Sequence, residues 1–249
     1  MKTLYSDLLL HVPHSSTSLP AEYFYTQNPF APGYQELINR SRDLVDYYTD
    51  QLFVPAQPGG RIHAIVAPLC RTLCDMERLP DDPLEKRHLG ILYGSPATRR
   101  SIFGISEQAD AKLRQLYTAY QISAASKLCE LESPLLIDCH SFSEYSTQLC
   151  EIGFEESCID ICLGFNEDAS KPDDETIQMV IGYFMDRGYT VGVNFPFSNA
   201  KTFCTGNHRY HSLMIEVNKR LYMDERTLSK AEGFARLRSD LQELYPLLC

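Results

Sequence analysis

The chain alternates between short apolar runs and longer segments in which apolar residues recur at helical spacing. The apolar runs have the length of β-strands and occur at residues 8–12, 62–67, 69–74, 135–139, 159–165, 190–195 and 213–217. The segments with helical spacing lie between them, at residues 36–53, 106–131, 174–187 and 228–244. Strands that alternate with helices predict an α/β fold, with helices packed on a mixed, mainly parallel sheet.

Local signals mark where several of these helices begin or end. Ser106 opens the longest helical segment, and we expect its side chain to cap the first turn. Gly188 follows another, as the residue type that most often terminates a helix. Pro246 predicts that the last helix ends before it. No repeat or convincing linker interrupts this pattern, so we expect residues 1–249 to form a single domain.

The composition is that of an acidic globular protein. Among its 249 residues, 33 acidic and 23 basic side chains give a net charge of −10, which argues against binding to nucleic acid. No apolar stretch approaches the roughly 18 residues of a membrane-spanning helix. The first apolar run is interrupted by Asp7 and lacks the cleavage site of a signal peptide. We therefore expect a cytoplasmic protein with no membrane partner.

The cysteines favour the same compartment. The chain has nine of them, an odd number, and their spacing forms no disulfide framework. Several lie within apolar runs, where a free cysteine behaves as a small hydrophobic residue. We expect them to be reduced and largely buried, as in other cytosolic proteins.

Two histidines stand at the ends of predicted strands, where open α/β sheets bind ligands. His14 follows the first strand, and from there an imidazole can reach a metal ion across the sheet edge. The strand at 135–139 runs into Asp138 and His140, so that Asp138 can orient His140 as a metal-bound ring requires. The alternatives are that His14 belongs to a simple turn and that Asp138 caps a helix.

One carboxylate interrupts an otherwise apolar strand. Glu216 lies within the run 213–217, where a carboxylate is costly unless it is paired. Burial there would raise its pKa towards the range that suits a general base. The alternative is a structural ion pair with Arg209 or Arg220.

Arginines follow the run at 69–74. Arg71 and Arg78 provide planar guanidinium groups of the kind that bind a carboxylate or stabilise an oxyanion. Asp75 and Glu77 stand between them in the sequence and are equally able to neutralise them in an ion-pair network.

In their order and combination, these segments resemble the N-formylglutamate amidohydrolase family. The likeness runs from about residue 8 to residue 225. Its most specific parts are Pro-His-Ser at 13–15, Asp-Cys-His-Ser at 138–141 and the stretch from Glu216 to Tyr222. Further matching segments lie at 46–53, 71–78, 90–94, 194–197 and 211–216.

The resemblance implies a three-layer α/β/α sandwich similar to the zinc carboxypeptidases and aspartoacylases, with a mixed sheet of about eight strands. It also implies one Zn²⁺ ion bound by His14 and His140. Carboxypeptidase-like sites place a glutamate three residues after the first histidine, where this chain has Thr17. Asp46 matches an acidic position of the family and is the third ligand that the resemblance implies.

The implied reaction is hydrolysis of the N-formyl amide bond of N-formyl-L-glutamate to formate and glutamate, as in histidine catabolism. The small-molecule substrate is thus an N-acyl acidic amino acid. Glu216 would act as the general base, and Arg71 would stabilise the oxyanion or hold a substrate carboxylate. The further residues expected to contact the substrate are Arg78, Asn194, Arg209 and His211.

Three other functions stay open on the sequence alone. A hydrolase of another N-acyl amino acid or a small peptide amide would share the metal site. A binding protein would keep the fold without the metal. A cysteine hydrolase would use Cys139 beside His140, although neighbours on a strand point to opposite faces.

Overall fold

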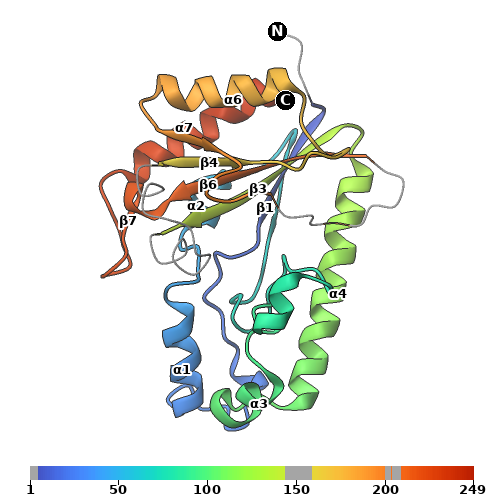
Figure 1. The fold of residues 1–249 in the computed structure, drawn as a ribbon, viewed down its shortest axis with the longest axis vertical. Helices are drawn as coiled ribbons and strands as arrows, with labels where there is room; N and C mark the ends of the chain where they lie inside the picture. Colours follow the sequence, from blue (N-terminus) through green and yellow to red (C-terminus); the bar gives the residue numbers. More distant parts are fainter. Residues whose placement is uncertain (1–4, 144–158, 200–202, 204–208) are drawn as a thin grey trace.

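The computed structural model describes residues 5–143, 159–199, 203 and 209–249, and the centre of this part is a six-stranded sheet (Figure 1). Its strands are β1 (Asp7–Val12), β2 (Ile62–Val66), β3 (Pro134–Phe142), β4 (Ile161–Gly164), β5 (Val191–Val193) and β6 (His211–Asn218). They follow the order β2-β1-β3-β6-β4-β5, and the first four in that order are parallel. Because β4 is antiparallel to β6, the sheet is mixed and mainly parallel, as predicted.

Helices cover both faces of this sheet and complete a three-layer α/β/α sandwich (Figure 1). The helices are α1 (Pro32–Ser41), α2 (Thr49–Phe53), α3 (Pro96–Thr98), α4 (Glu107–Glu130), α6 (Asp174–Asp186) and α7 (Phe234–Leu248). A short hairpin joins β7 (Met223–Asp224) to β8 (Ser229–Lys230). None of the helices in the described part of the chain is long and apolar enough to cross a membrane.

The alternation of side chains along β1 shows how the two outer layers are attached. Leu8 and Leu10 are fully buried in the cluster that includes residues of α2, α6 and α7. Leu9 points to the other face, where it packs with Ala124 and Leu128 of α4. Burying a leucine contributes about 1.5–3 kcal/mol, so this strand is strongly held on both faces.

A second apolar cluster lies below the sheet in Figure 1, around α1, α3 and the end of α4 that is nearer to them. It buries Leu37 of α1, Met76 and Ile91 of the long connection after β2, and Leu113 of α4. This cluster supports the connection that runs along the carboxyl ends of the parallel strands. It therefore positions one wall of the site described below.

The structure differs from the predicted strands and helices in several places. The main sheet has six strands in the described residues rather than about eight. Residues 69–74 form turns, because their apolar side chains are buried in the second cluster and not in a sheet. The helix expected over 36–53 is broken between α1 and α2, where Tyr48 has a left-handed backbone with φ of 66° and the Asp46 N–H donates to the His14 carbonyl.

The last helix also differs from its predicted bounds. The segment 229–230 is a strand of the hairpin, so α7 begins only at Phe234. The helix then runs through Pro246, although proline removes one hydrogen bond from a helix. Tertiary packing compensates: Tyr245 and Leu248 are buried, and the Tyr245 hydroxyl donates to the Phe53 carbonyl over 2.7 Å.

Candidate active site

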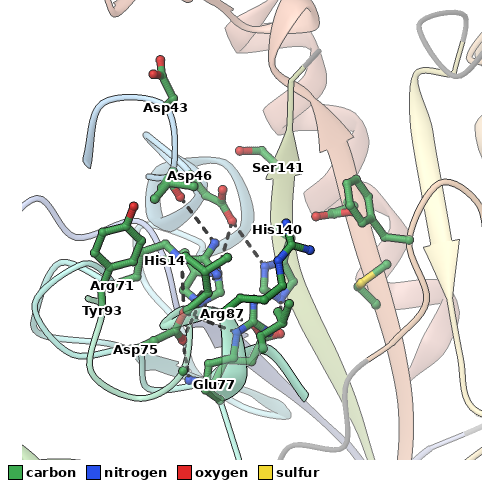
Figure 2. Close-up of a pocket in the computed structure, with 18 of the residues that line it drawn as sticks. His14, Asp43, Asp46, Arg71, Asp75, Glu77, Arg87, Tyr93, His140 and Ser141 are labelled. Atoms are coloured by element: carbon green, nitrogen blue, oxygen red, sulfur yellow. Dashed lines mark hydrogen bonds and ion pairs between the residues drawn. The ribbon is translucent and has the colours of Figure 1, made fainter. Parts of the chain in front are cut away.

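The parallel strands bring three of the predicted residues to one edge of the sheet. His14 comes two residues after β1, while His140 lies within β3 and Glu216 within β6. His140 and Glu216 are direct partners in the register of these two strands. All three line one pocket, shown in Figure 2, which has a volume of about 290 Å³.

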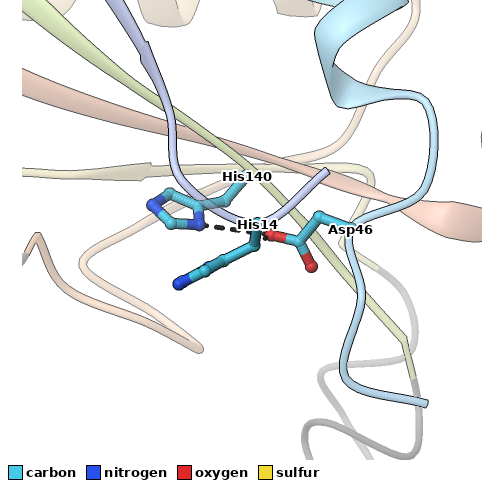
Figure 3. A group of neighbouring side chains, drawn as sticks. All are labelled: His14, Asp46 and His140. Atoms are coloured by element: carbon cyan, nitrogen blue, oxygen red, sulfur yellow. Dashed lines mark hydrogen bonds and ion pairs between the residues drawn. The ribbon is translucent and has the colours of Figure 1, made fainter. Parts of the chain in front are cut away.

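Both histidine rings direct one nitrogen to the same carboxylate oxygen. The Nδ1 atoms of His140 and His14 lie 3.3 Å and 3.6 Å from Oδ2 of Asp46. Figure 3 shows how the three side chains converge from β3, from the segment after β1 and from the turn before α2. All three are buried, and one donor atom of each lies within 4.8 Å of the others, a spacing at which they can hold a metal ion.

The break between α1 and α2 is what brings Asp46 to the histidines. The Asp46 N–H donates to the His14 carbonyl over 3.0 Å, which ties the turn to the end of β1. The Asp46 carbonyl accepts hydrogen bonds from the backbone N–H and the hydroxyl of Thr49 at the start of α2. The backbone of Asp46 is therefore fixed on both sides, and its carboxylate is free to face the two rings.

The far nitrogen of each ring faces a second set of carboxylates. His14 Nε2 lies 2.9 Å from Oδ1 of Asp75. His140 Nε2 lies 3.1 Å from Glu77 and 3.2 Å from Asp138. Carboxylates at this position fix the tautomer and orientation of a metal-binding imidazole. Asp138 thus has the place beside His140 that the sequence suggests, and it also bonds to His11 over 2.7 Å.

Two other groups of buried donors overlap with the first. One consists of His14, Asp75 and Glu77, and the other of Glu77, Asp138 and His140. Asp75 is already engaged, because Oδ1 accepts from His14 and from the Glu77 N–H while Oδ2 accepts from Arg71. In the group of His14, Asp46 and His140, the Nδ1 atoms face the ligand position. The Nε2 atom of each histidine then still has a carboxylate beside it.

The buried carboxylates and histidines of this cluster shift each other's pKa values. Burial raises the pKa of the Asp46 carboxyl, but hydrogen bonds from His14 and His140 outweigh it and hold that pKa well below its usual range. Burial likewise opposes ionisation of Glu77, but the neighbouring histidines lower its pKa to about 2. For His140, burial lowers the pKa, yet Glu77 and Asp138 together hold it well above its usual value. A metal ion binding here would have to displace the proton from that ring.

Glu216 has the opposite character. Burial is the largest influence on its carboxyl and raises the pKa to about 8, with the charge of His140 acting against it. Its Oε2 atom is buried and has no hydrogen-bond partner among the described residues. Neither Arg209 nor Arg220 forms an ion pair with it there, and Arg220 instead bonds to Asp160 over 2.7 Å. A carboxylate poised in this way is suited to accept a proton.

Comparisons with known proteins identify the family and a similar fold. A family model described as N-formylglutamate amidohydrolase matches residues 6–223. The chain belongs to the N-formylglutamate amidohydrolase family. Its fold is similar to the crystal structure of N-formylglutamate amidohydrolase from Ralstonia eutropha JMP134, with a TM-score of 0.64 and 22% identity over 99% of this chain and 93% of that chain. No curated protein sequence matches the chain.

Membership of the N-formylglutamate amidohydrolase family confirms the expected family and, with it, a hydrolase that acts on an amide bond. The implied likeness to zinc carboxypeptidases and aspartoacylases stays a prediction. So do the individual roles assigned to site residues, and the structure reports only where each of them lies.

The structure places the predicted arginines in two groups. Arg71 and Arg78 line the pocket. Arg71 is held by Asp75, which accepts from Nε over 3.1 Å and from Nη2 over 2.9 Å. Arg78 Nη1 lies 3.4 Å from Glu77. The ion-pair network that the sequence allowed between these residues is therefore present, in a largely buried form.

The other residues expected to contact the substrate lie outside the residues that line this pocket. Arg209 is exposed. His211 begins β6, at the opposite end of the strand from Glu216, and its ring packs edge-on against Tyr5. Asn194 is exposed and has a positive φ of 51°, and its side chain accepts a hydrogen bond from the Phe165 N–H. These three residues therefore lie apart from the residues that line the pocket, and their contact with the substrate stays a prediction.

Two cations of the pocket wall were missed. Lys219 directly follows β6 and is 3% exposed, and Arg87 ends the short helical turn Pro83–Arg87. The sequence feature that could have indicated Lys219 is its position in the stretch from Glu216 to Tyr222, which resembles the family. Arg87 gives no signal in the sequence, because a basic residue in a polar segment is most often only solvated.

Cys139 does not lie on the site face of β3. Its side chain is buried in the cluster formed with α2, α6 and α7. Burial raises the pKa of its thiol well above the usual value, which suppresses the nucleophilic thiolate. A cysteine hydrolase built on this residue is not supported.

Proposed function

We propose that this chain hydrolyses N-formyl-L-glutamate to formate and glutamate with one Zn²⁺ ion bound by His14, Asp46 and His140. The observation that carries the proposal is the convergence of both Nδ1 atoms on the Asp46 carboxylate, with Glu216 on the neighbouring strand. Imidazole and carboxylate are the ligand types of catalytic zinc sites that keep a position open for the reaction.

The charge balance of the pocket supports a divalent cation. The buried carboxylates around the two rings are Asp46, Asp75, Glu77 and Asp138. Among the described residues, the largely buried side-chain cations that line the pocket are Arg71, Arg78 and Lys219. Without a metal ion, the protonated His140 ring completes the compensation of these carboxylates. A dication at the Asp46 carboxylate would take over that role and leave the ring neutral, as a metal ligand must be.

The residues of the site then divide the chemistry. Zinc at this position would act as a Lewis acid towards the formyl carbonyl and the attacking water. Glu216 takes a proton from that water through its free Oε2 and delivers it to the departing amine. Asp75, Glu77 and Asp138 hold the two rings in the tautomer that presents Nδ1 to the metal.

The substrate and the setting follow from the family and the composition. An N-acyl acidic amino acid fits a small pocket that is lined by several cationic side chains. Release of glutamate from its N-formyl derivative would place the enzyme in histidine catabolism in the cytoplasm. A hydrolase of another N-acyl amino acid would use the same metal ligands and general base. A screen must therefore vary both the acyl group and the amino acid.

The test is metal analysis of the purified protein followed by a deacylation screen. We expect one equivalent of zinc and turnover of N-formylglutamate that chelation abolishes and added zinc restores. His14→Ala, Asp46→Ala and His140→Ala should each lose zinc and activity. His63→Ala is the matched control, since that ring lies on β2 and pairs with Asp7 away from the pocket.

Two results would contradict the proposal. If all three ligand variants keep a full equivalent of zinc, the metal is bound elsewhere. If N-acetyl amino acids are hydrolysed well and N-formylglutamate is not, the substrate is wrong although the metal site is right.

A further inference from the structure

Lys219 is an internal cation at the wall of the pocket. It begins the helical turn Lys219–Leu221 that follows β6, and Asn218 caps that turn by accepting a hydrogen bond from the Arg220 N–H. The cap fixes the backbone where the strand ends. The Lys219 side chain is directed into the protein and is 3% exposed, while Arg220 is turned outward to Asp160.

The ammonium group has no fixed partner. Among the described residues it forms no hydrogen bond and no ion pair, although Asp46, Glu225 and Glu216 are near enough to influence its charge. Burial lowers its pKa, with Asp46 opposing that effect. A buried lysine is tolerated in this state at a cost in stability, which a bound anion would remove.

The arginines of the pocket are less available. Arg71 has two of its nitrogens on Asp75 and a third 3.4 Å from the Leu44 carbonyl. Arg78 lies against Glu77, and its Nε is 3.9 Å from Asp75. Their charges are already compensated by protein carboxylates, so they are poor choices for a further carboxylate.

We propose that Lys219 binds the α-carboxylate of the substrate and so restricts the enzyme to free N-acyl amino acids. This rests on the function proposed above. The α-carboxylate is attached to the carbon that bears the scissile nitrogen, so it must lie beside the general base and the metal ligands. Lys219 lines the same pocket as Glu216 and Asp46, and it forms no ion pair within the described part of the chain. Arg87 is more exposed and faces the same pocket (Figure 2), where it suits the side-chain carboxylate.

A consequence is that N-formyl peptides are poor substrates. A peptide has an amide in place of the α-carboxylate, and that amide would leave the Lys219 ammonium buried and unpaired. Sites built to pair with a charged group reject analogues that lack it far more strongly than apolar pockets reject a size change. The specificity for single amino acids would then come from this lysine and not from a closed pocket.

The test compares N-formylglutamate with its α-amide, N-formylisoglutamine. The unmodified enzyme should prefer the acid by roughly 30-fold or more in kcat/KM, the range for a lost buried charge pair. Lys219→Met should lose most of that preference, through a higher KM for the acid and little change for the α-amide. Arg220→Met is the matched control, since Arg220 is the next residue in the chain and its side chain pairs with Asp160, away from the pocket. Zinc content is measured in every variant.

Several outcomes overturn the inference. Equal kcat/KM of the unmodified enzyme for both substrates would overturn it without any variant. Equal losses for both substrates in Lys219→Met would mean that the lysine acts on the oxyanion. Loss of zinc in that variant would mean that it only holds Asp46 in place.

A binding measurement separates this inference from the proposed reaction. Calorimetric titration of the zinc-loaded protein with L-glutamate and with isoglutamine reports on the α-carboxylate without turnover. If the protein hydrolyses no formyl amino acid, tighter binding of glutamate that Lys219→Met removes still supports the lysine site. Equal binding of the two ligands contradicts it.

Discussion

At the scale of single residues, Glu216 differs from the other carboxylates of the pocket in the direction in which its pKa is shifted. Its pKa is raised to about 8 by burial, and Oε2 has no partner among the described residues. We expect Glu216→Gln to retain zinc and to lose at least about 100-fold in kcat, the lower end of general-base effects. Glu175→Gln, exposed on α6, is the control. A near-normal kcat in a folded, zinc-containing Glu216→Gln protein would make Glu216 structural.

The sequence predicts those site residues whose surroundings are determined by their immediate neighbours in the chain. His14, His140 and Glu216 stand beside or inside apolar strands, so their common edge and the burial of the two histidines follow from the strand pattern. Lys219 needed the structure, because the turn that directs it inward and its neighbour outward depends on a cap at Asn218. The pairing of Arg71 with Asp75 was foreseen only as an alternative, since sequence proximity does not decide between a substrate and a protein carboxylate.

At the scale of secondary structure elements, one buried arginine joins the pieces that form the pocket wall. Arg99 is 1% exposed and lies in the helical turn Arg99–Phe103 after α3. It bonds to Asp110 on α4 over 2.8 Å and donates to the carbonyls of Tyr93 and Leu73. Tyr93 lines the pocket, and Leu73 precedes Asp75 by two residues. The position of the wall therefore depends on this side chain.

Replacing Arg99 should affect both stability and substrate binding. Arg99→Leu leaves Asp110 with less compensation and two buried carbonyls without a donor, so we expect a loss of about 3–5 kcal/mol in chemical denaturation. Substrate KM should rise because the wall is no longer held. Arg226→Leu, at a side chain that is 93% exposed, should change stability by no more than about 0.5 kcal/mol. A stability unchanged in Arg99→Leu would show that the apolar cluster alone holds this wall.

Helix ends could be predicted from the sequence where a single local residue, such as a cap, determines them. The cap at Ser106 and the left-handed Gly188 fixed two helix ends, and both are present in the structure. The break at Tyr48 and the continuation of α7 through Pro246 were not predictable, because tertiary contacts override local preference at both places. The break matters most for function, since it is the turn that brings Asp46 to the histidines.

At the scale of the whole molecule, the overall charge and the charge of the pocket act against each other. The net charge of −10 repels a substrate with two carboxylates, while Lys219 and Arg87 attract it only at short range. Salt weakens long-range forces over a Debye length of about 10 Å at 0.1 M but weakens contacts in a buried pocket much less. Added salt should therefore remove more repulsion than attraction.

We expect kcat/KM for N-formylglutamate to rise by roughly two- to threefold between low salt and about 0.2 M KCl at constant pH, because screening of the far field favours the approach of a dianion. N-formylglutamine carries one negative charge fewer, so its kcat/KM should rise by about half as much on a logarithmic scale. Zinc content measured at both ends of the salt series controls for metal loss. A steady fall of kcat/KM with salt would mean that the pocket cations, and not the acidic surface, govern the encounter with substrate.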